Sequence, residues 1–277
     1  MNEREMSLKS RINNIAKSKH IAAQVVLQNY MFERFLDRLS KSEYRSKFVI
    51  KGGILISALV GLDTRTTMDL DITLRNLPLT EEDIINAINN ICSIEVYDGV
   101  TFAYTSIGPI RKDDEYGGYR LKFNASFGSI VTPLSIDIST GDVITPNPIE
   151  YDYPTMFESD DSISLYGYNL ETVLAEKLHA IISRGELSTR PRDYYDVYVL
   201  TKTHRFNKNV FKQAFIATLE HRDNISLLDK VSDTLKEIES SSILEQQWDK
   251  YRNTFSYSSN IPFIDTVEAV KSLASLF

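Results

Sequence analysis

Residues 68–74, Met-Asp-Leu-Asp-Ile-Thr-Leu, constrain the fold of this chain more strongly than its other segments. Apolar and polar residues alternate along them, as in a strand with one buried face and one polar face. Asp69 and Asp71 therefore point the same way, with Cα atoms about 6.6 Å apart. Because Asp is depleted in strands and like charges repel, the pair predicts a bound cation.

A third aspartate repeats this pattern in Leu-Ser-Ile-Asp-Ile-Ser, residues 134–139. Ile136 and Ile138 share one face of the expected strand, and Asp137 lies on the other. On a neighbouring strand, Asp137 would complete a cluster of Asp69, Asp71 and Asp137 able to hold two Mg²⁺ or Mn²⁺ ions for in-line attack on a phosphate. The alternative is a solvated polar sheet face, which a lone Asp-x-Asp does not exclude.

A glycine turn precedes these aspartates. Lys51-Gly52-Gly53 separates an expected strand at 47–50 from a short helix that ends at Gly61. Glycines let a ligand approach the backbone closely, and the N-terminus of the following helix offers free N–H groups to phosphate. Lys51 adds a positive charge, although an ordinary strand-to-helix turn would have the same sequence.

The remaining patterns predict an α+β core followed by an all-helical half. We expect a helical N-terminal segment at 1–44, a sheet-bearing core at 45–155 and a helical domain at 156–277. Within the core, further strands are expected in 95–107, 119–127 and 134–139, with a helix at 80–91 and a proline-rich connection at 145–156. The expected C-terminal helices cover residues 169–184, 191–202, 207–221, 225–239, 243–254 and 265–276.

Two of these helices each direct one charge towards their apolar side. Lys177 falls within the apolar arc of the helix that begins after Asn169, and Asp193 lies on the apolar side of the next helix, with Asp196 at its edge. A buried lysine is rare unless it is paired or functional. The sequence leaves two interpretations open: a structural Lys177–Asp193 salt bridge, or a lysine that reaches a substrate.

Together these motifs resemble a known group of enzymes. Lys51-Gly52-Gly53, fifteen residues and then Asp69-Leu70-Asp71 is similar to the nucleotidyltransferase superfamily with the DNA polymerase β-type fold. Two further segments resemble the AbiEii/AbiGii toxin family more narrowly. They are Arg-x-Thr-x-Asp-x-Asp at 65–71, and Lys177 followed by Arg-Pro-Arg-Asp-Tyr-Tyr-Asp at 190–196. The superfamily usually has Gly-Ser in the turn, whereas Ile54 follows Gly52-Gly53 here, so backbone N–H groups would hold the phosphate.

The resemblance implies a metal-dependent transfer of a nucleotide from a nucleoside triphosphate to a hydroxyl. It implies catalytic roles for Asp69, Asp71, Asp137, Lys177 and Asp193, with Mg²⁺ or Mn²⁺ on the first three. It implies nucleotide-binding roles for Lys51, Gly52, Gly53, Arg65, Thr66 and Asp196. The implied acceptor is RNA, such as the 3′ end of tRNA, with growth arrest in a toxin–antitoxin or abortive-infection (phage defence) system. An antitoxin encoded alongside would act on transcription rather than by tight binding.

Charge and composition bear on the partners. Residues 1–50 carry ten Lys or Arg against five acids, although the whole chain has a net charge of −7. Lys9, Arg11, Lys17 and Lys19 could bind an RNA backbone, or could form a solvated helix face. Cys92 is the one cysteine, which excludes a disulfide within the chain. No signal sequence or membrane span is recognisable, so a cytoplasmic protein is expected.

Other interpretations remain open at this stage. The same chemistry would serve a small-molecule nucleotidyltransferase that modifies an antibiotic, and a catalytically inactive nucleotide-binding partner protein is the third alternative. Arg120 and Lys122 share the polar face of one strand, where they could contact phosphate or solvent. Among the remaining residues, His179 is expected at the surface, and Trp248 and Tyr251 in the C-terminal core.

Overall fold

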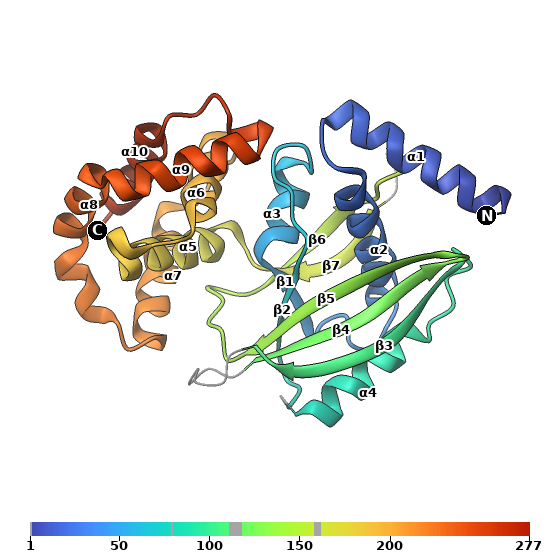
Figure 1. The fold of residues 1–277 in the computed structure, drawn as a ribbon. Helices are drawn as coiled ribbons and strands as arrows, with labels where there is room; N and C mark the ends of the chain where they lie inside the picture. Colours follow the sequence, from blue (N-terminus) through green and yellow to red (C-terminus); the bar gives the residue numbers. More distant parts are fainter. Residues whose placement is uncertain (1, 79, 111–117, 158–161) are drawn as a thin grey trace. The chain divides into compact units, whose positions relative to one another are not determined.

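The computed structural model describes residues 2–78, 80–110, 118–157 and 162–277. The chain divides into two compact units (Figure 1). We call Met1–Asp142 with Pro148–Tyr168 the sheet unit, and Val143–Asn147 with Asn169–Phe277 the helical unit. The N-terminal helices belong to the sheet unit, whereas the sequence suggests a separate segment that ends at residue 44.

The described strands of the sheet unit form one mixed sheet in the order β3-β4-β5-β2-β1-β7-β6. β2 runs parallel to β5 and β1 runs parallel to β7, and the other neighbours are antiparallel. The strands are β1 (Phe48–Lys51), β2 (Leu70–Leu74), β3 (Val100–Pro109), β4 (Gly118–Phe127), β5 (Ile130–Thr140), β6 (Ile149–Pro154) and β7 (Ser162–Gly167).

The alternation in the sequence gives this sheet one apolar face. Ile72 of β2 and Ile136 of β5 are fully buried, and β5 packs against the helix α2 (Ala23–Ser40). The Phe35 ring of α2 lies 5.6 Å from that of Phe123 on β4. The sheet unit also contains α1 (Glu3–Lys19), α3 (Gly52–Val60) and α4 (Glu81–Cys92). The helical N-terminal segment divides into α1 and α2, because His20 ends α1 in the left-handed conformation.

The helical unit agrees with the predicted helices except at 225–239, where Ile225–Lys230 form a 3-10 helix and the α-helix begins at Val231. Its helices are α5 (Leu170–Arg184), α6 (Pro191–Thr203), α7 (Lys208–His221), α8 (Val231–Ser240), α9 (Ser242–Thr254) and α10 (Phe263–Ala274). Trp248 is fully buried and donates from Nε1 to the carbonyl of Ile261 at 2.9 Å, so its predicted core position is confirmed, as is that of Tyr251. Across the described residues, no helix combines the length and the apolar character that a membrane span requires.

The sheet extends further along the chain than the sequence suggests. Residues 145–156 are expected to be a connection, but Ile149–Pro154 form β6, which pairs with β7. β6 is an edge strand with mostly exposed side chains, so it lacks a continuous apolar pattern, and Pro154 is tolerated at its end. The expected domain boundary at 155 therefore precedes the last strand of the sheet unit.

The prediction that His179 lies at the surface is wrong: its side chain on α5 is buried. α5 packs against α7 as well as α6, so it has a wider buried face than its apolar arc suggests. Burial lowers the pKa of His179 to about 4, and repulsion from Arg222 and Arg184 acts in the same direction.

This buried histidine makes stability depend on pH. The unfolded imidazole binds a proton near pH 6.5, whereas the folded one resists protonation to about pH 4. The neutral imidazole of His179 therefore contributes fully to the unfolding free energy above pH 6.5. This contribution is lost as the pH falls from 6.5 towards about 4. By pH 4.5 we expect a loss of about 2 kcal/mol of unfolding free energy from this group. In urea unfolding, H179Q should lose correspondingly less unfolding free energy than the wild type at low pH. Equal losses in H179Q and the wild type would contradict this prediction.

Candidate functional site

The structure places Asp71 and Asp137 side by side. β2 and β5 are parallel neighbours, and Asp71 lies directly opposite Asp137 in their register. Strands that pair are about 4.8 Å apart, so the two carboxylates project from the same face at adjacent positions. Asp69 is an exposed residue immediately before β2. The sequence-based expectation of neighbouring strands is therefore confirmed for these two aspartates.

The glycine turn lies against Asp71. Gly52, the first residue of α3, has a left-handed φ of 62°, and a Cβ at this position would lie 2.0 Å from Asp71 Oδ2. A Cβ on Gly53 would lie 2.5 Å from Thr67 Oγ1. The N-terminus of α3, with its positive dipole end, therefore adjoins the carboxylate of β2, and only residues without a side chain leave room for that approach.

Substitution of Gly52 tests this arrangement. G52A is expected to cost about 1–3 kcal/mol of unfolding free energy, because alanine disfavours a positive φ and its Cβ would displace Asp71. G108A is the matched control, since a Cβ on Gly108 of β3 would meet nothing within 4 Å. Thermal unfolding of both variants measures the difference; equal stability would show that Asp71 does not need this space.

Two amides of α2 hold the loop that precedes β2. Asn29 donates from Nδ2 to the carbonyl of Thr67 at 2.8 Å, and Gln28 donates from Nε2 to the carbonyl of Met68 at 2.8 Å. Thr67 in turn donates from Oγ1 to the carbonyl of Asp69 at 3.2 Å. These residues position Asp69, and sequence reasoning missed them; two amides within the apolar stretch of α2 were the available signal.

Arg65 and Thr66 are buried beside this loop rather than open to solvent. Arg65 donates from Nη1 to the carbonyl of Thr66, and Nη1 also lies 3.3 Å from where a Cβ of Gly53 would be. The predicted nucleotide-binding role of both residues stays a prediction. Their observed contacts hold the backbone between α3 and β2.

Lys51 belongs to a polar network within the sheet unit. Its ammonium group pairs with Asp142 and donates to Ser139 Oγ at 2.8 Å, while Thr73 Oγ1 donates to Asp142 Oδ2 at 2.6 Å. Burial alone would raise the pKa of Asp142, but Lys51 and the two hydroxyl groups hold it well below its ordinary value. The structure thus gives Lys51 an anionic partner beside the glycine turn, and its predicted contact with phosphate stays a prediction.

Asp137 is held by an arginine on the adjacent strand. Arg120 of β4 lies opposite it and donates from Nε to Oδ1 at 2.7 Å and from Nη2 to Oδ2 at 2.6 Å. The pKa of Arg120 is raised, first by Asp137 and then by Asp69 and Asp71, so all three carboxylates lie within electrostatic reach of one guanidinium. Among the described residues, no three acidic, histidine or cysteine side chains are arranged to hold a metal ion.

Lys177 joins both predicted acids of the helical unit. Its Nζ lies 2.7 Å from Asp193 Oδ1 and 2.9 Å from Asp196 Oδ2, so α5 and α6 are linked by one cation and two carboxylates. Asp196 is fully buried and Asp193 nearly so. The predicted Lys177–Asp193 pair is therefore present. The sequence places Asp196 at the edge of the apolar arc of its helix, whereas the structure buries it fully.

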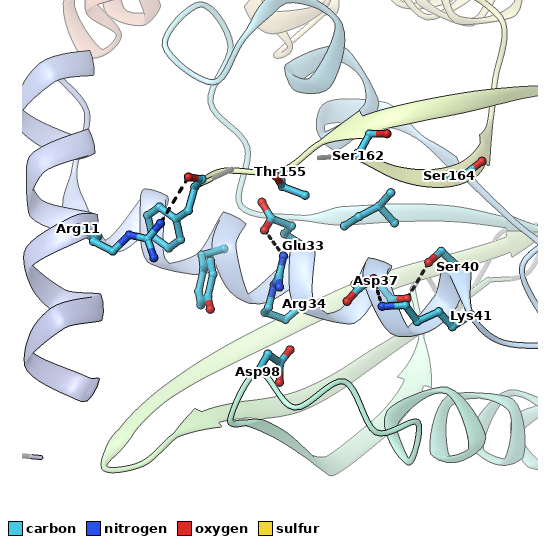
Figure 2. Close-up of a pocket in the computed structure, with 13 residues that line it drawn as sticks. Arg11, Glu33, Arg34, Asp37, Ser40, Lys41, Asp98, Thr155, Ser162 and Ser164 are labelled. Atoms are coloured by element: carbon cyan, nitrogen blue, oxygen red, sulfur yellow. Dashed lines mark hydrogen bonds and ion pairs between the residues drawn. The ribbon is translucent and has the colours of Figure 1, made fainter. Parts of the chain in front are cut away.

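The basic N-terminal helix is partly engaged with its own unit. Lys19 pairs with Asp63 at 2.7 Å, and the Arg11 guanidinium lies 3.8 Å from the centre of the Phe157 ring. Arg11 lines a cavity of about 420 Å³. Figure 2 shows its side chain among the residues that line this cavity. The other charged residues that line it form ion pairs within the protein: Arg34 with Glu33, Lys41 with Asp37, and Asp98 with Arg38. It shares no lining residue with the predicted carboxylate site.

Comparison with solved structures identifies the class of fold. The crystal structure of JHP933 from Helicobacter pylori is similar, with a TM-score of 0.53, 16% sequence identity and 92% of each chain covered. A candidate nucleotidyltransferase from H. pylori has 17% identity and a TM-score of 0.48, over 92% of this chain and 95% of that one. The likeness to JHP933 shows a shared fold, and in this chain that fold holds two aspartates in register beside a glycine turn.

The family follows from the sequence. The profile of the nucleotidyl transferase AbiEii toxin family, from type IV toxin–antitoxin systems, matches residues 34–270. The chain therefore belongs to the AbiEii family, which confirms the predicted resemblance and makes it a toxin-type nucleotidyltransferase with an antitoxin as partner. No curated protein matches the sequence.

Proposed function

We propose that this protein transfers a nucleotide from a nucleoside triphosphate to a hydroxyl group of RNA, with Asp69 and Asp71 as the principal carboxylates. The observation that carries the proposal is the contact between Asp71 and the first residue of α3, where a Cβ on Gly52 would lie 2.0 Å from Oδ2. A carboxylate can bind a cation, and a helix N-terminus can bind a phosphate. Because the two lie so close together here, they suit a cation and a phosphate that bind as one unit.

The donor atoms at this site suit Mg²⁺ or Mn²⁺. Asp69 and Asp71 offer carboxylate oxygens, which hard divalent cations prefer, and the absent side chain of Gly52 leaves a space beside Asp71. When bound, the cation would offset the charge of the triphosphate and make the acceptor hydroxyl more acidic. Asp137, the third predicted ligand, is held by Arg120 in this structure.

The protein's own groups have separate tasks in this proposal. Asp69 and Asp71 hold the cation, and the N–H groups at the start of α3 receive phosphate oxygens in place of the serine that related enzymes usually have. Asn29 and Thr67 keep the Asp69 backbone in place. The catalytic roles predicted for Lys177 and Asp193 remain part of the proposal and are supported by the family resemblance alone.

An RNA acceptor, with the 3′ end of tRNA as the leading candidate, is supported by the toxin family and by the basic α1. Lys9 and Lys17 are exposed on this helix, whereas Lys19 pairs with Asp63. We expect K9E/K17E to weaken RNA binding and to reduce its log–log salt slope by about one to two. Fluorescence anisotropy between 50 and 200 mM salt measures both quantities. An unchanged slope would remove α1 from the RNA-binding surface.

The direct test supplies each of the four α-labelled triphosphates with Mg²⁺ and total bacterial RNA. We expect one triphosphate to label RNA, and EDTA to abolish the transfer. Label that appears on a small molecule, with none on RNA, would favour a small-molecule nucleotidyltransferase. The assay is repeated in a bacterial extract, which contains both RNA and small molecules as acceptors. Absence of transfer from every triphosphate in that extract would contradict the proposal.

The antitoxin is proposed to act on transcription, so it should not co-purify with the protein.

A further inference from the structure

Arg120 offsets part of the negative charge of the predicted carboxylate site. Three carboxylates within reach of one another repel, and each would be costly to keep ionised without a nearby positive charge. The guanidinium of Arg120 contacts both oxygens of Asp137 and lies in the field of Asp69 and Asp71. It therefore occupies the electrostatic role that a divalent cation would have at the same carboxylates.

A cation on Asp137 and the observed arginine pair oppose each other. Both Asp137 oxygens already accept hydrogen bonds from Arg120, at 2.7 and 2.6 Å. A divalent ion bound to the same carboxylate would lie next to a positive guanidinium and be repelled by it. Binding of a metal ion that takes Asp137 as a ligand, as the sequence predicts for the three aspartates, therefore favours release of Arg120.

Arg120 has room to move and a suitable second partner. Its side chain is 47% exposed, whereas that of Asp137 is 17% exposed, so rotation into solvent displaces no packed core. A guanidinium is planar and binds phosphate oxygens in the same two-pronged manner as carboxylate oxygens. A triphosphate that arrives with its cation would present such oxygens beside the aspartates.

We infer that Arg120 is a nucleotide-binding residue that changes partner: it holds Asp137 in the free protein and the triphosphate in the loaded one. This inference rests on the proposed function of the carboxylate site. It predicts opposite consequences for the two ligands when Arg120 is removed. Cation binding in the absence of nucleotide should improve, because a competing positive charge is gone, whereas triphosphate binding should weaken.

The first measurement is Mn²⁺ affinity without nucleotide, followed by the electron paramagnetic resonance signal of free Mn²⁺. R120Q is expected to bind Mn²⁺ about fivefold to tenfold more tightly than the wild type. R120K keeps the positive charge but not the two-pronged geometry, so its Mn²⁺ affinity should stay closer to that of the wild type. D71N should bind Mn²⁺ much more weakly, which shows that the aspartates are the site.

The second measurement is calorimetry with inorganic tripolyphosphate and Mg²⁺, a probe that needs no knowledge of the preferred base. R120Q should bind it at least about tenfold more weakly, because a two-pronged charged contact is lost. R75Q is the matched control: it removes an exposed arginine just after β2, roughly 13 Å from Asp71 along the strand, where its charge is largely screened. R75Q should leave both affinities unchanged.

The outcomes separate this inference from the proposed function. A wild type that binds no Mn²⁺, or a D71N variant that binds it as tightly as the wild type, would overturn the metal site and the inference together. If Mn²⁺ binding depends on Asp71 but R120Q changes neither affinity, or changes both in the same direction, only the exchange of partners is overturned. Circular dichroism melting of R120Q and R120K confirms that the compared proteins are folded.

Discussion

D71N is expected to reduce nucleotide transfer by about a thousandfold or more while leaving the protein folded. Asparagine keeps the shape of Asp71 above Gly52, so the turn where a Cβ would lie 2.0 Å from Oδ2 is preserved. The negative charge is lost, however, and with it one of the two carboxylates proposed to hold the cation. Single preorganised electrostatic groups of this kind commonly contribute several kcal/mol to a transition state.

Asp63 provides the comparison for this variant. It lies in the same connection between α3 and β2, is about half exposed, and pairs only at the surface with Lys19. D63N should therefore keep wild-type activity. Incorporation of labelled nucleotide into acid-insoluble RNA measures all three proteins. If D71N retained more than a tenth of the wild-type rate, the carboxylate of Asp71 could not have the role assigned to it.

The largest expected effect on stability is that of K177M, which should cost about 3–5 kcal/mol of unfolding free energy. Lys177 is the cation that joins Asp193 and Asp196, at 2.7 and 2.9 Å, and both acids are buried. Without it, two neighbouring carboxylates would remain in a medium that stabilises charge poorly, and their mutual repulsion would add to the cost. Chemical unfolding of the full chain, monitored by circular dichroism, measures the loss.

K250M controls for the change of lysine to methionine, because Lys250 is exposed on α9. It should change stability by less than about 0.5 kcal/mol. The triple variant K177M/D193N/D196N should recover part of the loss, since neutral amides no longer require a cation. A K177M protein as stable as the wild type would show that the ion pairs are not structurally important, and would strengthen the interpretation that Lys177 serves the substrate.

The sequence was most informative where a regular pattern coincided with chemistry. Alternation in residues 68–74 and 134–139 predicted two strands with aspartates on one face, and the parallel register of Asp71 and Asp137 agrees with it. The inward charges of Lys177 and Asp193 were recognisable for the same reason, because a charged residue within an apolar arc is conspicuous. In each case the period of the secondary structure determines where the side chain points.

The remaining features depend on tertiary contacts that no local pattern encodes. β6 has an edge position, so its residues carry little apolar signal. His179 is buried on α5, which packs against both α6 and α7, and its Nε2 lies 3.5 Å from Asn224 Nδ2, beyond the end of α7. The pairing of Arg120 with Asp137 depends on the register between β4 and β5, which is a property of two strands together. Such features require the assembled sheet or helix bundle.

The central claim is that Asp69 and Asp71 bind a divalent cation together with a triphosphate at the start of α3. The most direct measurement is a crystal structure with Mn²⁺ and a non-hydrolysable triphosphate analogue, with data collected at the manganese absorption edge. We expect an anomalous peak bound by carboxylate oxygens of Asp69 and Asp71, with phosphate oxygens at the N–H groups of Gly52 and Gly53. Manganese bound to the triphosphate at another place in the protein, with neither aspartate among its ligands, would contradict the claim.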